Sequence, residues 1–88
     1  MSETYNQDYY VPIVWTDLTT VYSTMASVAS YVQNKSNHNI LVAYTANTSA
    51  PTGGGQLIRF SFSATGNAAH IWAKSLGGST ALVALGVV

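Results

Sequence analysis

The stretch VASYVQNKSNHNILVAYT, residues 28–45, decides the fold that the sequence predicts. Its first six residues alternate in character, with Val28, Ser30 and Val32 on one face of an extended chain. Its last six residues, ILVAYT, are typical of a strand, and the six between are all Asn, Lys, Ser or His. Asn and Ser side chains satisfy local backbone groups in turns. We therefore expect a β-hairpin over residues 28–45.

Further short strands are predicted on both sides of this hairpin. One covers residues 11–16, where Pro12 confines it to a sheet edge or to the start of the strand. Another covers residues 56–63. The last two are residues 70–74 and residues 80–88, and the second of these (TALVALGVV) is apolar on both faces, as in a strand buried on both sides.

One of these strands has a strongly apolar face, because Ile58, Phe60 and Phe62 occupy alternate positions in it. We expect both phenylalanines in the hydrophobic core. The same is expected of Trp15 and Trp72, since large aromatic side chains contribute much of the buried area in small domains.

Three other segments are predicted to be turns or loops. The turn at residues 17–20 begins with a single helical turn that Thr16 or Asp17 caps. Residues 46–55 contain a proline and three consecutive glycines, which predicts a loop at one end of the fold. Residues 64–67 turn the chain between two strands.

Together these elements predict an all-β fold. We expect a small antiparallel β-sandwich or barrel, jelly-roll-like, with five to seven short strands. Residues 1–10 (MSETYNQDYY) have neither a strand period nor a helix period. Residues 1–12 are therefore predicted to be an extended N-terminal arm, and residues 13–88 the β domain.

The composition favours association with other protein. Only three basic and three acidic side chains are present among 88 residues, and the net charge is zero. A soluble domain usually has about a quarter of its residues charged, so little repulsion keeps copies of this chain apart. Small domains are often stabilised further by disulfides, a metal or a partner. Because the chain has no cysteine, we expect a homo-oligomer.

No residue pattern predicts chemistry. His38 and His70 have no cysteine, no acid near them in the sequence and no His-x-His spacing, so no metal site and no general base is expected. The run Gly53-Gly54-Gly55 lacks the Lys and Ser/Thr that follow a phosphate-binding loop. We therefore expect no enzyme, no catalytic residue, no cofactor and no metal.

Nucleic acid and membranes are not expected as partners either. The basic residues are too few and too dispersed for a nucleic-acid-binding groove. The longest apolar stretches are about nine residues, which is too short to cross a bilayer. The first residues lack the basic and apolar regions of a secretion signal, so synthesis and folding in a cytoplasm are expected.

Two parts of the chain supply candidate interface residues. The tyrosines of the arm are the first, because aromatic residues are enriched at interfaces and no core lies within the arm itself. The apolar side chains of the last strand are the second, and we expect them to pack in the core or between subunits. The candidates are Tyr5, Tyr9, Tyr10, Val83, Leu85 and Val87.

Three short motifs lie among the predicted elements: W-T-D-L at residues 15–18, Q-N-K-S at residues 33–36 and I-W-A at residues 71–73. With the Pro/Gly loop and the terminal apolar strand, they give residues 15–88 a resemblance to small all-β virion proteins of tailed bacteriophages. Such proteins are commonly capsid cement or decoration proteins, or small tail, neck or fibre components. The resemblance implies a structural role and a homo-oligomer, with a trimer as the expected form.

We therefore predict a virion protein, made in the host cytoplasm, that stabilises the capsid shell through its arm and its apolar strand surfaces. Its partners would be copies of itself and the major capsid protein or another virion protein. The alternative is a tail, neck or fibre component, including a receptor-binding module. In that alternative, Tyr44 and the Asn-rich turn at residues 34–39 would bind a host glycan, beside the loop at residues 46–55.

Overall fold

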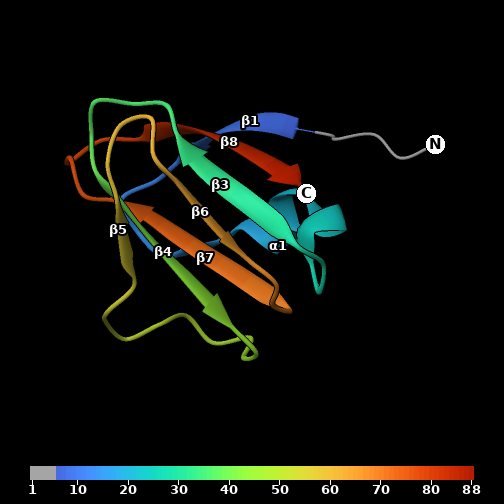
Figure 1. Ribbon diagram of the computed structural model, residues 1–88. Coiled ribbons are helices and arrows are strands. Elements are labelled where there is room, and N and C mark those ends of the chain that lie inside the picture. Colours follow the sequence, from blue (N-terminus) through green and yellow to red (C-terminus); the bar gives the residue numbers. More distant parts are fainter. Residues whose placement is uncertain (1–5) are drawn as a thin grey trace.

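The computed structural model describes residues 6–88, which form eight strands and two short helices (Figure 1). The helices are α1 (Leu18–Val21) and the single 3-10 turn η1 (Ser23–Met25). The strands are β1 (Asn6–Val11), β2 (Thr16–Asp17), β3 (Ser30–Asn34), β4 (Ile40–Thr45), β5 (Gln56–Ile58), β6 (Ser63–Gly66), β7 (His70–Ser75) and β8 (Ala81–Val87).

The strands form two antiparallel sheets of four strands each, which pack together as a sandwich. Their orders are β1-β8-β3-β6 and β2-β7-β4-β5. β1 pairs with β8, β2 with β7, β3 with β6 and β4 with β5, which is the pairing of one long hairpin. The pairs β3–β8 and β4–β7 complete the two sheets when this hairpin is rolled up. This is a jelly roll. The all-β prediction is confirmed, although residues 6–88 contain one strand more than the five to seven expected.

The hairpin predicted over residues 28–45 is wrong in its pairing, although both of its strands exist. β3 pairs with β8 and β6, whereas β4 pairs with β7 and β5 in the other sheet. The connection at residues 35–39 therefore crosses from one sheet to the other. None of its residues has the positive φ angle that a tight two-residue hairpin turn requires.

The buried side chain of Asn34 holds this crossing in place. Its Nδ2 donates to the carbonyl oxygens of His38 (2.7 Å) and Ile58 (2.9 Å). Its Oδ1 accepts from the backbone N–H and from the hydroxyl of Ser36, both at 2.9 Å. A primary amide offers two donors and one oxygen that accepts twice. All of its hydrogen-bonding capacity is therefore used, and it replaces the cross-strand hydrogen bonds that a hairpin would make here.

The strand predicted over residues 56–63 is also divided between the two sheets. β5 ends at Ile58 in one sheet, and β6 begins at Ser63 in the other. Between them Ser61 has a φ of 67°, a left-handed conformation that interrupts an extended chain. Residues 64–67, predicted as a turn, lie mostly in β6. The alternating side chains continue through the break, so the sequence pattern could not locate it.

This break moves two aromatic side chains out of the predicted core. Phe60 and Phe62 are 57% and 65% exposed, so the prediction that they are core residues is wrong. Trp72 is 8% exposed, which confirms its predicted burial. Trp15 is only partly buried, with its ring below the ammonium group of Lys74, 5.5 Å from the ring centroid.

The N-terminal segment supplies a strand that the sequence did not predict. β1 runs antiparallel to β8, from Asn6 opposite Gly86 to Val11 opposite Ala81. Residues 6–11 of the predicted arm are therefore part of a sheet. Because the partner of β1 is the other end of the chain, local periodicity carries no sign of this pairing.

The other predicted elements are present within a few residues of their expected bounds. β4 covers residues 40–45 as predicted. β7 covers the predicted residues 70–74 and one residue more, and β8 lies within the predicted residues 80–88. The strand predicted over residues 11–16 is interrupted after its first residue, and only β2 follows. Asp17 caps α1, as one of the two predicted alternatives.

The hydrophobic core lies between the two sheets, and the helices cover one end of it (Figure 1). α1 contacts β7 in one sheet and η1 contacts β8 in the other, so the helices join the sheets. Leu18 and Met25 of these helices are fully buried. The large apolar side chains that the strands bury completely are Val11, Val32, Ile40, Val42, Ile71, Val83 and Leu85. Within residues 6–88, neither helix has the length and hydrophobicity needed to cross a membrane.

We expect Asn34→Ala to lower the free energy of unfolding by about 2–4 kcal/mol, because four side-chain hydrogen bonds are lost at once and the buried carbonyl of Ile58 loses its amide donor. Urea unfolding followed by tryptophan fluorescence measures the change. Asn37→Ala, at an exposed position of the same connection, is the matched control and should change stability by less than about 0.5 kcal/mol. Equal losses in the two variants would contradict the role given to Asn34.

Candidate binding surfaces

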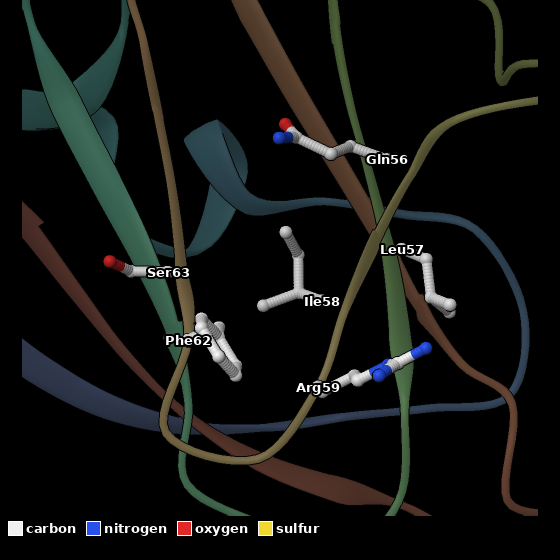
Figure 2. Close-up of a pocket in the computed structure, with 6 residues that line it drawn as sticks. All are labelled: Gln56, Leu57, Ile58, Arg59, Phe62 and Ser63. Atoms are coloured by element: carbon white, nitrogen blue, oxygen red, sulfur yellow. The ribbon is translucent and has the colours of Figure 1, made fainter.

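A pocket of about 260 Å³ lies between strands β5 and β6 (Figure 2). β5 is the edge strand of one sheet and β6 is the edge strand of the other. Each strand therefore has one side of its backbone without a strand partner, and these sides are available for hydrogen bonds. The residues that line the pocket are Gln56, Leu57, Ile58, Arg59, Phe62 and Ser63.

Three of these side chains extend between the strands. Figure 2 shows Gln56 and Ile58 extending from β5 toward β6, and the ring of Phe62 extending back toward β5. Ile58 is 3% exposed and forms an apolar floor, whereas Phe62 is 65% exposed. Leu57 and Arg59 alternate with them and extend from the opposite face of β5 (Figure 2). The space between the strands thus has an apolar floor, an aromatic wall and one side-chain amide.

Asn34 positions both walls of this pocket. Besides the hydrogen bond from its side chain to the carbonyl of Ile58, its backbone N–H donates to the carbonyl of Phe62 (3.0 Å). Its own carbonyl accepts from the N–H of Ser61 (2.8 Å). One buried residue therefore fixes β5 and the turn that leads into β6. Hydrogen bonds from within the folded domain therefore hold both sides of the pocket.

Arg59 is distinguished by its lack of partners. Among the charged residues within residues 6–88, Lys35 binds Asp8 (3.0 Å), Lys74 lies over an aromatic ring and Asp17 contacts a histidine. In this part of the chain, Arg59 alone has no ion pair, hydrogen bond or aromatic contact through its charged group. Its guanidinium is exposed and remains available to solvent or to a ligand.

A second apolar surface lies where the chain passes from β1 to β2, and we call it the β1–β2 corner. It consists of Tyr10, Ile13 and Val14, which are 62%, 52% and 62% exposed. Of the other tyrosines predicted to contact a partner, Tyr9 packs against the core and Tyr5 lies outside the described residues. The sequence signal for this corner is the set of apolar residues on either side of Pro12. A proline there interrupts the strand whose alternating side chains would otherwise be buried in a sheet.

The interface candidates of the last strand lie in or against the core. Val83 and Leu85 are fully buried, and Val87 packs partly buried against the core. The sequence left the core and a subunit contact open for these three residues. All three lie in or against the core of this chain, and Val83 and Leu85 offer no surface to a partner.

Two of the residues predicted to bind a glycan are buried or partly buried. The ring of Tyr44 lies directly over Gly66, where an added Cβ would come within 2.7 Å of it, and it packs against the core. Its hydroxyl is buried without a hydrogen-bond partner, and this burial raises the pKa of Tyr44 to about 12. Asn34 of the predicted turn is itself buried. Asn37 and Asn39 of the same turn are exposed, so the glycan-binding alternative stays a prediction.

A polar network lies where β2 and α1 meet β7. One carboxylate oxygen of Asp17 accepts from the backbone N–H (3.0 Å) and the hydroxyl (2.6 Å) of Thr19, and the other lies 2.8 Å from Nδ1 of His70. Burial raises the pKa of Asp17, but the hydrogen bonds from Thr19 and His70 outweigh it and hold this pKa below its ordinary value. His70 has no acid near it along the chain, yet Asp17 contacts it in space.

The two histidines lie in separate places. His38 is in the crossing between β3 and β4, where its Nε2 is 3.1 Å from the hydroxyl of Ser79. Within residues 6–88, no three His, Asp or Glu side chains come close enough together to hold a metal ion.

Searches of protein-family models, of curated proteins and of solved structures returned no match to this chain. Its function is therefore inferred from its own residues and their geometry.

We expect Asp17→Ala to lower the free energy of unfolding by about 1–2 kcal/mol at pH 7, through loss of the helix cap and of the contact with His70. Because folding lowers the pKa of Asp17 below 3.8, its carboxylate stabilises the fold above that pH and loses this effect as pH falls through the lowered value. The difference in free energy of unfolding between Asp17→Ala and the unchanged protein should therefore become smaller below pH 4. Urea unfolding at pH 7 and pH 2.5 measures this difference.

Asp8→Ala is the matched control for this experiment. Asp8 forms only the exposed ion pair with Lys35, and such pairs contribute at most about 1 kcal/mol. A loss in Asp17→Ala that is no larger than the loss in Asp8→Ala, or that is constant with pH, would contradict the role of the Asp17 carboxylate.

Proposed function

We propose that this protein is a structural protein of a phage virion, a capsid cement or decoration protein that binds the shell as a homo-oligomer. The jelly roll supports this, because viral capsid proteins use the same architecture. Lectins and cupins use it too, so the fold alone does not define the function. The observation that carries the proposal is the β1–β2 corner, where three large apolar side chains are more than half exposed.

The size of this corner favours attachment by several linked copies. Burying the exposed half of one such side chain contributes about 1 kcal/mol, so one corner supplies roughly 3 kcal/mol. A micromolar complex needs about 8 kcal/mol. Linked copies raise the effective concentration of every corner after the first has bound. The proposed state is therefore a homo-oligomer, a trimer by the resemblance to phage virion proteins, seated on the major capsid protein or another virion protein.

The proposed attachment uses apolar contact rather than ion pairs. The corner contains no charged residue, and the nearest ion pair in β1, between Asp8 and Lys35, joins side chains that are both exposed. Screening by salt acts mainly on interactions between exposed charges. Binding to the shell should therefore change little between low and high salt.

A tail, neck or fibre component remains the second structural role for the same surface. A tail, neck or fibre component differs from a cement protein in its partner and in its copy number. Binding to empty shells therefore distinguishes these two roles.

The first measurement is the mass of the purified protein, followed by co-sedimentation with shells of its own phage assembled without it. We expect a trimer that binds shells in many copies, raises their melting temperature and stays bound at 1 M salt. A double variant, Ile13→Ser with Val14→Ser, should remain folded but lose most shell binding. Leu76→Ser, at an exposed leucine outside the corner, is the matched control and should bind normally. A monomer, or an oligomer that ignores shells, would contradict the cement role.

A further inference from the structure

We propose that the pocket between β5 and β6 binds one ring of a neutral saccharide. The proposal does not rest on attachment to a capsid shell. β1 and β2 are the edge strands on one side of the sandwich, and β5 and β6 are the edge strands on the other. The pocket and the β1–β2 corner therefore lie at opposite edges, and both can be occupied together.

The exposed apolar side chains around the pocket do not by themselves make a stable interface between two copies of this chain. Leu57, Phe60 and Phe62 are 47%, 57% and 65% exposed. With about 200 Å² for a large side chain, they expose roughly 300 Å² together, whereas a stable interface needs about 800 Å² from each partner. The pocket volume of about 260 Å³ is slightly below the range for drug-sized small-molecule sites, which begins near about 300 Å³. A ligand of one or two rings fits this size.

The chemistry of the pocket matches a molecule that is apolar on one face and polar at its rim. The exposed ring of Phe62 offers an apolar surface, with the nearly buried Ile58 at the floor, and the negative face of an aromatic ring attracts C–H groups. The amide of Gln56 can donate and accept at once. The backbone edges of β5 and β6 add further donors and acceptors. A sugar ring has both features, because its C–H groups form one face and its hydroxyls project around it.

The charge of the pocket favours a neutral sugar over an acidic one. Arg59 is the only charged residue that lines it. Its side chain leaves β5 on the face opposite to Gln56 and Ile58 (Figure 2). The three groups that extend between the strands are uncharged. A carboxylate placed among these three groups would be partly desolvated, and the guanidinium of Arg59 extends from the opposite face of β5, away from them.

The other exposed aromatic side chain of this turn provides an internal comparison. Phe60 is exposed to nearly the same degree as Phe62 but does not line the pocket. If exposure alone caused binding, the two phenylalanines would be equivalent. If the pocket binds the sugar, only Phe62 matters.

The test is an NMR titration of the full chain with glucose, galactose, mannose and N-acetylglucosamine, and with maltotriose and mannotriose. We expect at least one of these sugars to shift the amide signals of residues 56–63. Phe62→Ala should weaken its binding at least tenfold and Gln56→Ala at least fivefold, whereas Phe60→Ala should change it less than twofold. Since Phe62 and Gln56 are exposed, both variants should fold, and circular dichroism verifies this. A trisaccharide that binds more tightly than its monomer would indicate a surface glycan as the source, and equal affinity a free sugar.

Two further ligands make the proposal falsifiable without any variant. Benzyl alcohol tests a purely apolar occupant, such as a partner's side chain, and glucuronic acid tests an anionic one. Stronger binding of benzyl alcohol than of every sugar would overturn the proposal, as would a preference for glucuronic acid that Arg59→Gln abolishes. Absence of shifts with all six sugars would overturn it too, as would equal losses in Phe60→Ala and Phe62→Ala.

Discussion

The buried amide of Asn34 is the interaction on which both the fold and the candidate pocket depend. It binds the crossing between β3 and β4 through Ser36 and His38, and it binds β5 through Ile58. Its backbone holds the turn that leads into β6. An unsatisfied amide in this position would cost more than its hydrogen bonds contribute, because a buried polar group without partners pays its full desolvation. The observed arrangement satisfies all the hydrogen-bonding groups of the Asn34 side chain at once.

The sequence predicted which segments are strands much better than it predicted how they pair. β4, β7 and β8 were found from local alternation and apolar runs, and Asp17 from its capping chemistry. Pairing depends on which segments meet in space. Residues 34–39 have the composition of a hairpin turn, and only the burial of Asn34, which composition does not reveal, makes them a crossing. β1 was missed for the same reason, because its partner is the far end of the chain.

The candidate surfaces were less predictable than the fold. The exposure of Phe60 and Phe62 follows from a single residue, Ser61, with a positive φ angle, and serine carries no strong signal for that conformation. Periodicity assigned both rings to the core because an interrupted strand and a continuous one have the same alternation. Which side chains are exposed at the edge of a sandwich depends on where the strands of its two sheets begin and end. Pairing between segments far apart in the sequence determines those bounds.

The three motifs from which a resemblance to phage virion proteins was predicted contain several residues that determine the fold. Leu18 in W-T-D-L and Asn34 in Q-N-K-S are buried, as is all of I-W-A at residues 71–73. Such residues define a core and a crossing, which proteins with different surfaces can share. The resemblance therefore bears on the architecture more directly than on the partner. The residues exposed at the two edges of the sandwich, such as Ile13 and Phe62, are free of the demands of the core.

The two edges differ in chemistry, and this difference argues for separate tasks. The β1–β2 corner is apolar, with exposed side chains on both sides of a proline that prevents further strand pairing. The β5–β6 edge is hollow, and its open space combines an aromatic ring with an amide. An apolar corner gains most from contact with another apolar protein surface, whereas a small mixed pocket gains most from a small polar ligand with one apolar face. A protein attached by the first edge would present the second edge away from its attachment site.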